Sequence, residues 1–405
     1  MTAANTTGQR ERETVGADLF GPVRLGPLTL RNRVIKAATY ENAARRGLVT
    51  QDLIDFHVRH ARGGVGMTTV AYCAVAPEGR TDGHQIVWRE EARAGLQRLT
   101  EAVHAEGAAI SAQIGHSGPV GDPRATRMKA LSPTPYFNPQ AFTRTAQATS
   151  ADLARIVAQH GDAARMAVET GFDAVEVHIG HNYLASSFLS PRLNRRKDEY
   201  GGSLRNRARV ARDSLRAVRD AVGDRIAIIA KMNMTDGVPG GFWLDEAIEV
   251  ATWIEQDGSV DALEMTEGSS LLNPMYLFRG EAPIEQFAAA VGQPVGTAVR
   301  LVGKRFLREY PYADLYLLEH ARQVRAAVRL PMVLLGGVTS TAGVQTAVDS
   351  GFEFVAMGRA LLREPGLVAE MARNASARSL CIHCNRCMAT IYSGTRCVLA
   401  ERRVE

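Results

Sequence analysis

Eight short apolar segments, separated by longer amphipathic stretches, run through most of the 405-residue chain. Several of them, such as AAISAQIG (108–115) and AVEVHIG (174–180), are almost continuously apolar. Such runs are typical of parallel strands that are buried on both faces. The segments lie at 33–38, 66–72, 108–115, 174–180, 225–233, 262–268, 331–337 and 352–359.

The stretches between these segments have helical spacing, and several end at a glycine, the usual stop signal of a helix. They lie at 51–61, 90–107, 151–171, 204–223, 244–258 and 317–328. The alternation predicts a (β/α)8 TIM barrel with enlarged βα loops. A doubly wound open sheet is the alternative, but it would bring a G-x-G-x-x-G motif after an early strand, which the sequence lacks.

The barrel is expected to occupy residues 17–373, after a disordered leader at 1–16 and before a Cys-rich C-terminal extension at 374–405. The net charge of +5 is mild, and Lys and Arg are mixed with Asp and Glu. Nothing resembles the basic stripe of a nucleic-acid-binding protein. No apolar run approaches the roughly 18 residues of a membrane span, and the polar start has no signal-peptide core. We therefore expect a cytoplasmic enzyme without nucleic-acid or membrane partners; a homo-oligomer is compatible with the sequence.

In a TIM barrel, the reacting groups lie where strands run out into the βα loops. The strand ends carry Ala38, Thr39, Tyr40, Ala71, Gln113, His178, Lys231, Gly336, Gly337, Gly358 and Arg359. Two long connections, 116–150 and 268–316, are candidate substrate loops.

The glycines after the last two strands predict a phosphate site. Gly336-Gly337 and Gly358-Arg359 each end a strand that leads into a helix, with Thr339 or Ser340 as a candidate N-cap. Glycine lets backbone N–H groups approach a phosphate, and a helix N-terminus adds positive potential. The alternative is that these are ordinary turn glycines.

Five polar side chains at strand ends could form an acceptor site. Lys231 ends an apolar strand, either as a fixed cation facing an electron-rich ring or as a lysine reaching solvent. Gln113 offers an acceptor and two donors to an amide-like ring edge. His178 and His181 could be metal ligands, core residues or hydrogen-bond donors to a substrate oxygen, with Tyr183 as a proton donor. No third metal ligand has an obvious position, which favours the interpretation of the two histidines as hydrogen-bond donors to a substrate.

The segment HIGHNYLASSFLSPRLNRRKDEYGGSLRNRAR (178–209) resembles the signature of the Old Yellow Enzyme family of FMN-dependent NAD(P)H:acceptor oxidoreductases. So do LFGPVRLGPLTLRNRVIKA (19–37), SAQIGHSG (111–118) and the glycine motifs near the end. The resemblance extends over roughly residues 18–372 with the motifs in the same order.

The resemblance implies FMN as cofactor, NAD(P)H as reductant and ping-pong reduction of the C=C bond of a small enone-type substrate. His178 and His181 match the family's carbonyl-binding pair, and Tyr183 matches its proton donor. Gln113 and Lys231 match residues at the flavin pyrimidine edge. The remaining cofactor-binding matches are Ala38, Thr39, Ala71, Gly336, Gly337, Gly358 and Arg359.

Two positions depart from the family pattern. The flavin-tuning Thr or Cys of the family falls on Tyr40, with Thr39 one place earlier, so either side chain is a candidate to face the flavin. Asn182 stands where many relatives have glycine, which predicts a different backbone path for the loop that carries Tyr183.

Four cysteines crowd into the tail with spacings of two, two and nine residues. This pattern suits a [4Fe-4S] cluster or a tetrahedral zinc, and a tail of reduced thiols is the third interpretation. It resembles the cluster segment of the dienoyl-CoA reductase and trimethylamine dehydrogenase branch of the family. The four are Cys381, Cys384, Cys387 and Cys397.

Two other functions stay open. A flavin dehydrogenase or demethylase would pass electrons out through the cysteine tail. A flavin-free barrel lyase or aldolase would instead use Lys231 as a Schiff-base amine. A purified protein without flavin absorbance would favour the lyase or aldolase over both flavin-dependent functions.

Overall fold

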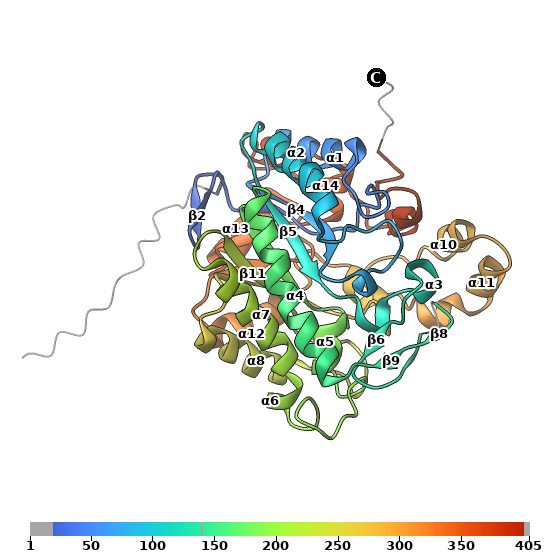
Figure 1. The fold of residues 1–405 in the computed structure, drawn as a ribbon. Helices are drawn as coiled ribbons and strands as arrows, with labels where there is room; N and C mark the ends of the chain where they lie inside the picture. Colours follow the sequence, from blue (N-terminus) through green and yellow to red (C-terminus); the bar gives the residue numbers. More distant parts are fainter. Residues whose placement is uncertain (1–18, 139–140, 401–405) are drawn as a thin grey trace, which may run out of the picture.

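The computed structural model describes residues 19–138 and 141–400, and these form a closed barrel of eight parallel strands (Figure 1). The strand order is β10-β11-β12-β13-β14-β3-β4-β5, so that consecutive barrel strands are neighbours throughout. The strands are β3 (Val34–Lys36), β4 (Met67–Ala74), β5 (Ala109–Gly115), β10 (Ala174–Ile179), β11 (Ala227–Asn233), β12 (Ala262–Thr266), β13 (Met332–Leu334) and β14 (Phe354–Met357). The predicted (β/α)8 barrel is confirmed. The expected leader at 1–16 lies outside the described residues.

Helices surround the barrel on its outer side. They are α1 (Gln51–Arg62), α2 (Arg93–His104), α4 (Ser150–Glu169), α7 (Arg209–Val222), α8 (Leu244–Asp257), α12 (Leu318–Ala327), α13 (Thr341–Asp349), α14 (Arg359–Arg363) and α15 (Leu367–Met371). Ser340 caps α13 by accepting from the Gly343 N–H. The helix expected over 204–223 is interrupted at Ala208, with α6 (Leu204–Arg207) before it and α7 after it.

The barrel interior is apolar at its N-terminal end. A hairpin of β1 (Val23–Leu25) and β2 (Leu28–Leu30) closes this end, and Leu25 and Leu30 pack against Ile35, Phe354 and other interior side chains. Burial of these hydrocarbon side chains stabilises the fold. The polar side chains of the interior lie toward the opposite end, where the βα loops begin.

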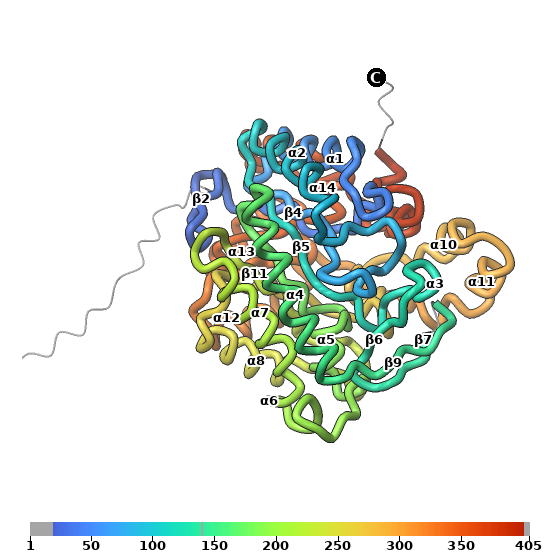
Figure 2. Tube along the Cα trace, viewed as in Figure 1, coloured from blue at the N-terminus to red at the C-terminus, as the bar shows by residue number. Residues whose placement is uncertain are grey.

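The two long connections contain short elements of their own (Figure 2). Between β5 and α4 lie η3 (Gly118–Val120), α3 (Pro123–Thr126), β6 (Leu131–Ser132), β7 (Phe137–Asn138), β8 (Thr143–Arg144) and β9 (Ala146–Gln147). Between β12 and α12 lie α9 (Pro274–Phe278), α10 (Ile284–Val291) and α11 (Val295–Phe306), of which the last two project from the barrel. The remaining short elements are η1 (Pro77–Gly79), η2 (Glu90–Ala92) and α5 (Leu184–Leu189).

The C-terminal tail folds back onto the mouth of the barrel. Its helical turn η4 (Arg386–Tyr392) packs against α10. The Thr395 N–H donates to the Glu41 carbonyl at 2.9 Å, and the Thr395 hydroxyl donates to the Tyr40 carbonyl. The tail therefore contacts the loop that follows β3.

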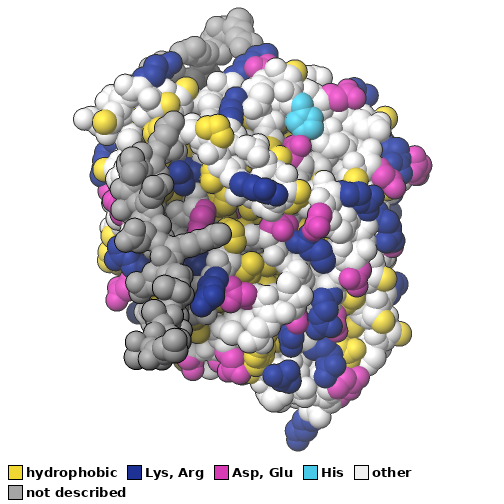
Figure 3. All heavy atoms as spheres, turned by 90° about the vertical axis from the view of Figure 1, so that its left-hand side faces the viewer, with side chains coloured by type: hydrophobic (Ala, Val, Ile, Leu, Met, Phe, Trp, Pro, Cys, Tyr) yellow, Lys and Arg dark blue, Asp and Glu magenta, His cyan; other side chains and the backbone are white. Residues whose placement is uncertain are grey.

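The surface shows charges of both signs. On the face drawn in Figure 3, Lys and Arg side chains lie interspersed with Asp and Glu. Among the helices of the described residues, none is long and apolar enough to cross a membrane.

Candidate active site

His178, His181 and Tyr183 lie together where β10 ends. The ring centroids of His178 and His181 are 5.0 Å apart, and the Tyr183 ring lies 4.6 Å from that of His178. Both histidines are buried, and Tyr183 is half-buried at the start of α5. The structure therefore brings together the three side chains predicted to contact the acceptor.

The two histidines differ in their hydrogen bonds. The backbone N–H of His181 donates to Asn233 Oδ1 at 3.0 Å, and its Nε2 lies 2.9 Å from Thr266 Oγ1. Nδ1 of His178 is buried without a hydrogen-bond partner in residues 19–138 and 141–400. Because buried polar atoms are normally paired, this nitrogen marks a position where a bound molecule could complete the site.

Burial determines the protonation of all three groups. Burial lowers the pKa of His178 well below its ordinary value, and His181 and Lys231 lower it further. Burial and then Lys231 lower the pKa of His181 to about 3. Burial, with a smaller contribution from Asp82, raises the pKa of Tyr183 to about 12. Near neutral pH the site therefore presents two neutral imidazoles and a protonated phenol.

Asn182 supports the turn that carries Tyr183. His181 and Asn182 have φ values of +56° and +58°, in the left-handed region that Asn adopts more readily than most residues. The Asn182 side chain donates to Asp236 Oδ1 at 3.1 Å, and its backbone N–H donates to Ser186 Oγ at 3.2 Å. With asparagine at this position, Tyr183 lies beside His178.

A layer of polar side chains lies beside and beneath the histidines inside the barrel. Lys231 Nζ donates to Glu264 Oε1 at 2.5 Å and lies 3.6 Å from Glu176 Oε1. Gln113 Nε2 donates to the same Glu176 oxygen at 2.6 Å. All four side chains are buried, so Lys231 does not reach solvent at the rim. Gln113 and Lys231, both predicted to contact a cofactor ring, are connected through Glu176.

The charge on Lys231 does not favour Schiff-base chemistry. Burial by itself lowers the pKa of Lys231, but Glu176 and Glu264 together raise it above its ordinary value. A Schiff-base lysine needs the opposite shift, because the neutral amine is the nucleophile. The lyase or aldolase alternative therefore loses its catalytic group.

The two candidates after β3 have different partners. Thr39 Oγ1 accepts from Lys36 Nζ at 2.6 Å, and its methyl group lies 3.9 Å from where a Cβ on Gly358 would stand. The Tyr40 hydroxyl donates to the Asp82 carboxylate instead. Thr39 thus faces the gap beside the end of β14, whereas Tyr40 is held by the loop after β4.

Ala38 and Ala71 lie next to the acceptor side of the site. Both belong to a small apolar cluster that includes Tyr72 and Tyr183. The Ala71 N–H is 3.2 Å from both carboxylate oxygens of Glu41. The ends of β3 and β4 are thereby packed against the loop that carries Tyr183.

The paired glycines after β13 are required by close packing against the segment 315–317. Gly336 and Gly337 have φ values of +93° and +79°. A Cβ on Gly336 would lie 2.5 Å from Leu317 Cγ, and one on Gly337 would lie 2.6 Å from the Leu315 N atom. This packing by itself accounts for the pair. Gly358 differs, because an added Cβ would have only Thr39 within 4 Å, so there is room beside this residue.

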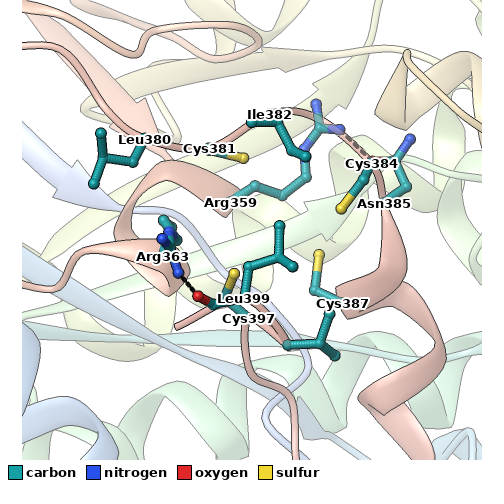
Figure 4. A pocket seen from close by; sticks show the side chains of 11 residues that line it. Arg359, Arg363, Leu380, Cys381, Ile382, Cys384, Asn385, Cys387, Cys397 and Leu399 are labelled. Atoms are coloured by element: carbon teal, nitrogen blue, oxygen red, sulfur yellow. Dashed lines mark hydrogen bonds between the residues drawn. The ribbon is translucent and has the colours of Figure 1, made fainter. Parts of the chain in front are cut away.

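The four tail cysteines line one cavity. Figure 4 shows their sulfurs directed toward the space between them, beside Arg359 and Arg363. Arg359 donates to Asn385 Oδ1 and, at 3.0 Å, to the Arg279 carbonyl, so this predicted phosphate ligand also holds the cysteine segment. The cysteines are Cys381, Cys384, Cys387 and Cys397.

A site for a single metal ion is not supported. Within the described ranges, no group of three His, Cys, Asp or Glu side chains is arranged to hold one ion. This finding supports neither zinc nor an iron–sulfur cluster in the tail, and it does not support a metal at His178 and His181. Burial raises the pKa of the Cys387 thiol to about 11.

Sequence reasoning missed three side chains of the site. Glu176 and Glu264 flank Lys231, and Thr266 contacts His181. The signal for the glutamates was present, because each interrupts an otherwise apolar strand run, AVEVHI and ALEMT. A fully buried glutamate is rare unless it is paired, so each predicts a partner inside the barrel.

Known proteins resemble this chain over most of its length. Residues 18–271 match the model of the NADH:flavin oxidoreductase / NADH oxidase family. The chain is 51% identical over 386 residues to the 4,4'-dithiodibutanoate disulfide reductase of Rhodococcus erythropolis, covering 95% of this chain and 96% of that protein. It is 31% identical over 375 residues to the NADH oxidase of Thermoanaerobacter brockii, covering 91% of this chain and 53% of that protein. The chain thus spans about half the length of the second relative.

Solved structures share the fold. The 2-naphthoyl-CoA reductase structure has a TM-score of 0.80 at 24% identity, covering 94% of this chain and 56% of that one. An Old Yellow Enzyme homologue from Zymomonas mobilis has a TM-score of 0.70 at 22% identity, covering 90% and 95%. The family match and the 51% relative go further than fold, and they confirm the resemblance to Old Yellow Enzymes. The chain is a member of the NADH:flavin oxidoreductase / NADH oxidase family.

Proposed function

We propose that the chain is an FMN-dependent NAD(P)H:acceptor oxidoreductase that reduces small organic disulfides. Two features of the barrel mouth fit FMN: the buried pair Gln113 and Lys231, and the room beside Gly358. Gln113 and Lys231 would hold the pyrimidine edge of the ring, and Ala38, Thr39 and Ala71 would lie against it. The phosphate would be held by Gly336, Gly337, Gly358 and Arg359.

The side chains of the site would bind and protonate the acceptor. FMN, when bound, supplies hydride exchange between NAD(P)H and an acceptor. His178 and His181 would hold the atom that gains negative charge, as neutral donors in a buried site. Tyr183 would give that part of the acceptor its phenolic proton and regain one from solvent.

The disulfide assignment rests on the 51% identity with the disulfide reductase over nearly the full length of both chains. In that reaction a hydride adds to one sulfur and the S–S bond breaks. The other sulfur leaves as a thiolate, which takes the proton of Tyr183. The products are two thiols, so one hydride and one proton balance the reaction.

The histidine pair favours a second candidate acceptor, the activated C=C bond of an α,β-unsaturated carbonyl compound. Two neutral imidazoles with centroids 5.0 Å apart suit a single carbonyl oxygen. The hydride would then add to the β-carbon, and Tyr183 would protonate the α-carbon.

Anaerobic stopped-flow measurement of the purified holoprotein tests both candidates. The flavin is first reduced with NADH or NADPH and then mixed with 4,4'-dithiodibutanoate or with 2-cyclohexenone. We expect fast reoxidation by the disulfide. Fast reoxidation by the enone alone would replace the disulfide assignment with the ene-reductase one. Protein without flavin absorbance would overturn both.

The cysteine cavity supports a further part of the proposal, a [4Fe-4S] cluster. In such a cluster each thiolate binds a different iron, so four thiols surround a volume rather than meet at one ion. The lining of one cavity by all four cysteines fits that geometry. Arg359 and Arg363 at the same cavity favour the thiolate form.

Iron, sulfide and zinc analysis of anaerobically purified protein tests the cluster. We expect about four irons per chain, and loss of them in Cys384→Ser. The control is Cys73→Ser, because Cys73 is buried in β4 and does not line the cavity. Stoichiometric zinc, or no metal, would refute the cluster. Reduction of the cluster by an amine substrate, without NAD(P)H, would favour the dehydrogenase alternative over acceptor reduction.

A further inference from the structure

Two fully buried carboxyl groups share one lysine inside the barrel. Glu176 on β10 and Glu264 on β12 both contact the Nζ of Lys231 on β11, the strand between them. Gln113 adds one hydrogen bond to Glu176. The Oε2 atoms of both glutamates are buried without a hydrogen-bond partner among the residues that the structure describes.

The charges of this group do not balance. With both carboxyls ionised, the two glutamates and Lys231 carry a net charge of −1 in a site closed to water. The other titratable groups that face it do not restore neutrality. His178 and His181 are neutral. Lys36, the last residue of β3, brings one further positive charge, on which Glu41 acts more strongly than Glu176 does. An uncompensated buried charge is strongly unfavourable, and two adjacent carboxylates resist simultaneous ionisation.

We propose that Glu176 and Glu264 form a proton-exchanging pair that positions and tunes Lys231. The pair takes up one proton from solvent when negative charge is placed on the cofactor ring, and it releases that proton when the charge leaves. This inference rests on the proposed FMN site, because Lys231 is the side chain assigned to the ring.

Two observations support the exchange. Burial and the neighbouring Glu264 raise the pKa of Glu176 to about 7, although Lys231 and Gln113 act in the opposite sense. The contact of Lys231 with Glu264, at 2.5 Å, is the shorter of the two, so the more weakly held Glu176 is the member that exchanges the proton. The hydride brings two electrons and its own hydrogen from NAD(P)H. The proton on the pair comes from solvent, so atoms and charge balance.

The first test uses the wild-type holoprotein. Infrared difference spectra between its NAD(P)H-reduced and oxidised forms should show a protonated carboxyl C=O band that gains intensity on reduction and shifts in D2O. The absence of any carboxyl band near neutral pH would overturn the proposal. This measurement does not depend on the folding of a variant.

The second test is the flavin midpoint potential as a function of pH. In Glu264→Gln and in Glu176→Gln, the slope of the midpoint potential around neutral pH should correspond to one proton fewer per two electrons than in the wild type. Ser111→Ala is the matched control, since Ser111 is buried on β5 two residues before Gln113 and carries no charge. It should keep the wild-type slope.

The outcomes separate this inference from the proposed function. Flavin that binds and is reduced, with the same slope in wild type and both variants, overturns the carboxyl pair and leaves the oxidoreductase assignment standing. Protein that binds no flavin overturns both. A slope that changes equally in Ser111→Ala also overturns the pair, because the effect would then follow any change in the interior.

Discussion

His181 Nε2 lies 2.9 Å from Thr266 Oγ1, although Thr266 comes 85 residues later in the chain, at the end of β12. His178, three residues before His181, has a buried Nδ1 without a partner in the described part of the chain. One imidazole is therefore oriented by the protein, and the other has a nitrogen free to bind the acceptor.

Removal of the Thr266 hydroxyl should weaken the binding of an anionic ligand by the His181 imidazole. Thr266→Val keeps the shape of the side chain but leaves the imidazole without its partner. We expect roughly tenfold weaker binding of a phenol, which corresponds to the loss of about one hydrogen bond. The long-wavelength charge-transfer band of the holoprotein reports this binding. Thr266→Ser keeps the hydroxyl and should bind as wild type; equal loss in both variants would contradict the orienting role.

Replacement of His178 should have a larger effect on the same band. His178→Ala removes the imidazole whose Nδ1 lacks a protein partner. The phenol titration should lose most of its amplitude, while the flavin remains bound. An unchanged titration would show that His178 does not contact the ligand.

Tyr183→Phe should separate the two half-reactions. Without the phenolic proton, transfer to the acceptor should slow by about 10²–10⁴-fold, whereas reduction of the flavin by NAD(P)H stays nearly intact. Tyr72→Phe is the matched control, because the Tyr72 ring lies 5.3 Å from that of Tyr183 and its hydroxyl donates to the Gly79 carbonyl. Equal slowing of both half-reactions in Tyr183→Phe would refute the proton-donor role.

Acid should destabilise the fold through its buried histidines. The pKa is lowered to about 3 for His60, His116 and His181 and to about 4 for His160, chiefly by burial. Below pH 6.5 these imidazoles bind protons in the unfolded chain, whereas they remain neutral in the folded chain. The free energy of unfolding should therefore fall by about 1.4 kcal/mol per pH unit for each such histidine, until the pH reaches about 3 to 4.

Urea melts between pH 7 and pH 4 measure this dependence. Glu41 and Glu176 act in the opposite sense, because their raised pKa values, about 8 and 7, stabilise the fold as the pH falls toward 4.5. The histidines outnumber them, so the net slope should be a loss of stability. Constant stability across this range would contradict neutral burial of the imidazoles.

Gly337→Ala should reduce both stability and flavin content. A Cβ there would lie 2.6 Å from the Leu315 N atom at a φ of +79°, so the segment after it must move. We expect a loss of about 1–3 kcal/mol and a lower FMN-to-protein ratio. Gly258→Ala is the control: its φ of +62° and ψ of 22° lie in the left-handed region, and no atom lies within 4 Å of the added Cβ. That variant should lose only about 1 kcal/mol and no flavin.

The barrel and much of the site could be predicted from the chain alone. The continuously apolar runs and the amphipathic stretches between them reflect local periodicity, which depends only on which face of each element is buried. The strand ends follow from these runs, and they place His178, Gln113 and Lys231 at the same end of the barrel.

Tertiary structure decided which side chains meet there. Glu264 reaches Lys231 across 33 residues of sequence, and Thr266 reaches His181 across 85. Arg359 contacts Asn385 in the tail, although sequence reasoning assigned it to phosphate alone. These pairings depend on strand register and barrel closure, which bring together residues far apart in the chain. Local periodicity does not determine these pairings, so only the folded barrel defines which charges surround Lys231.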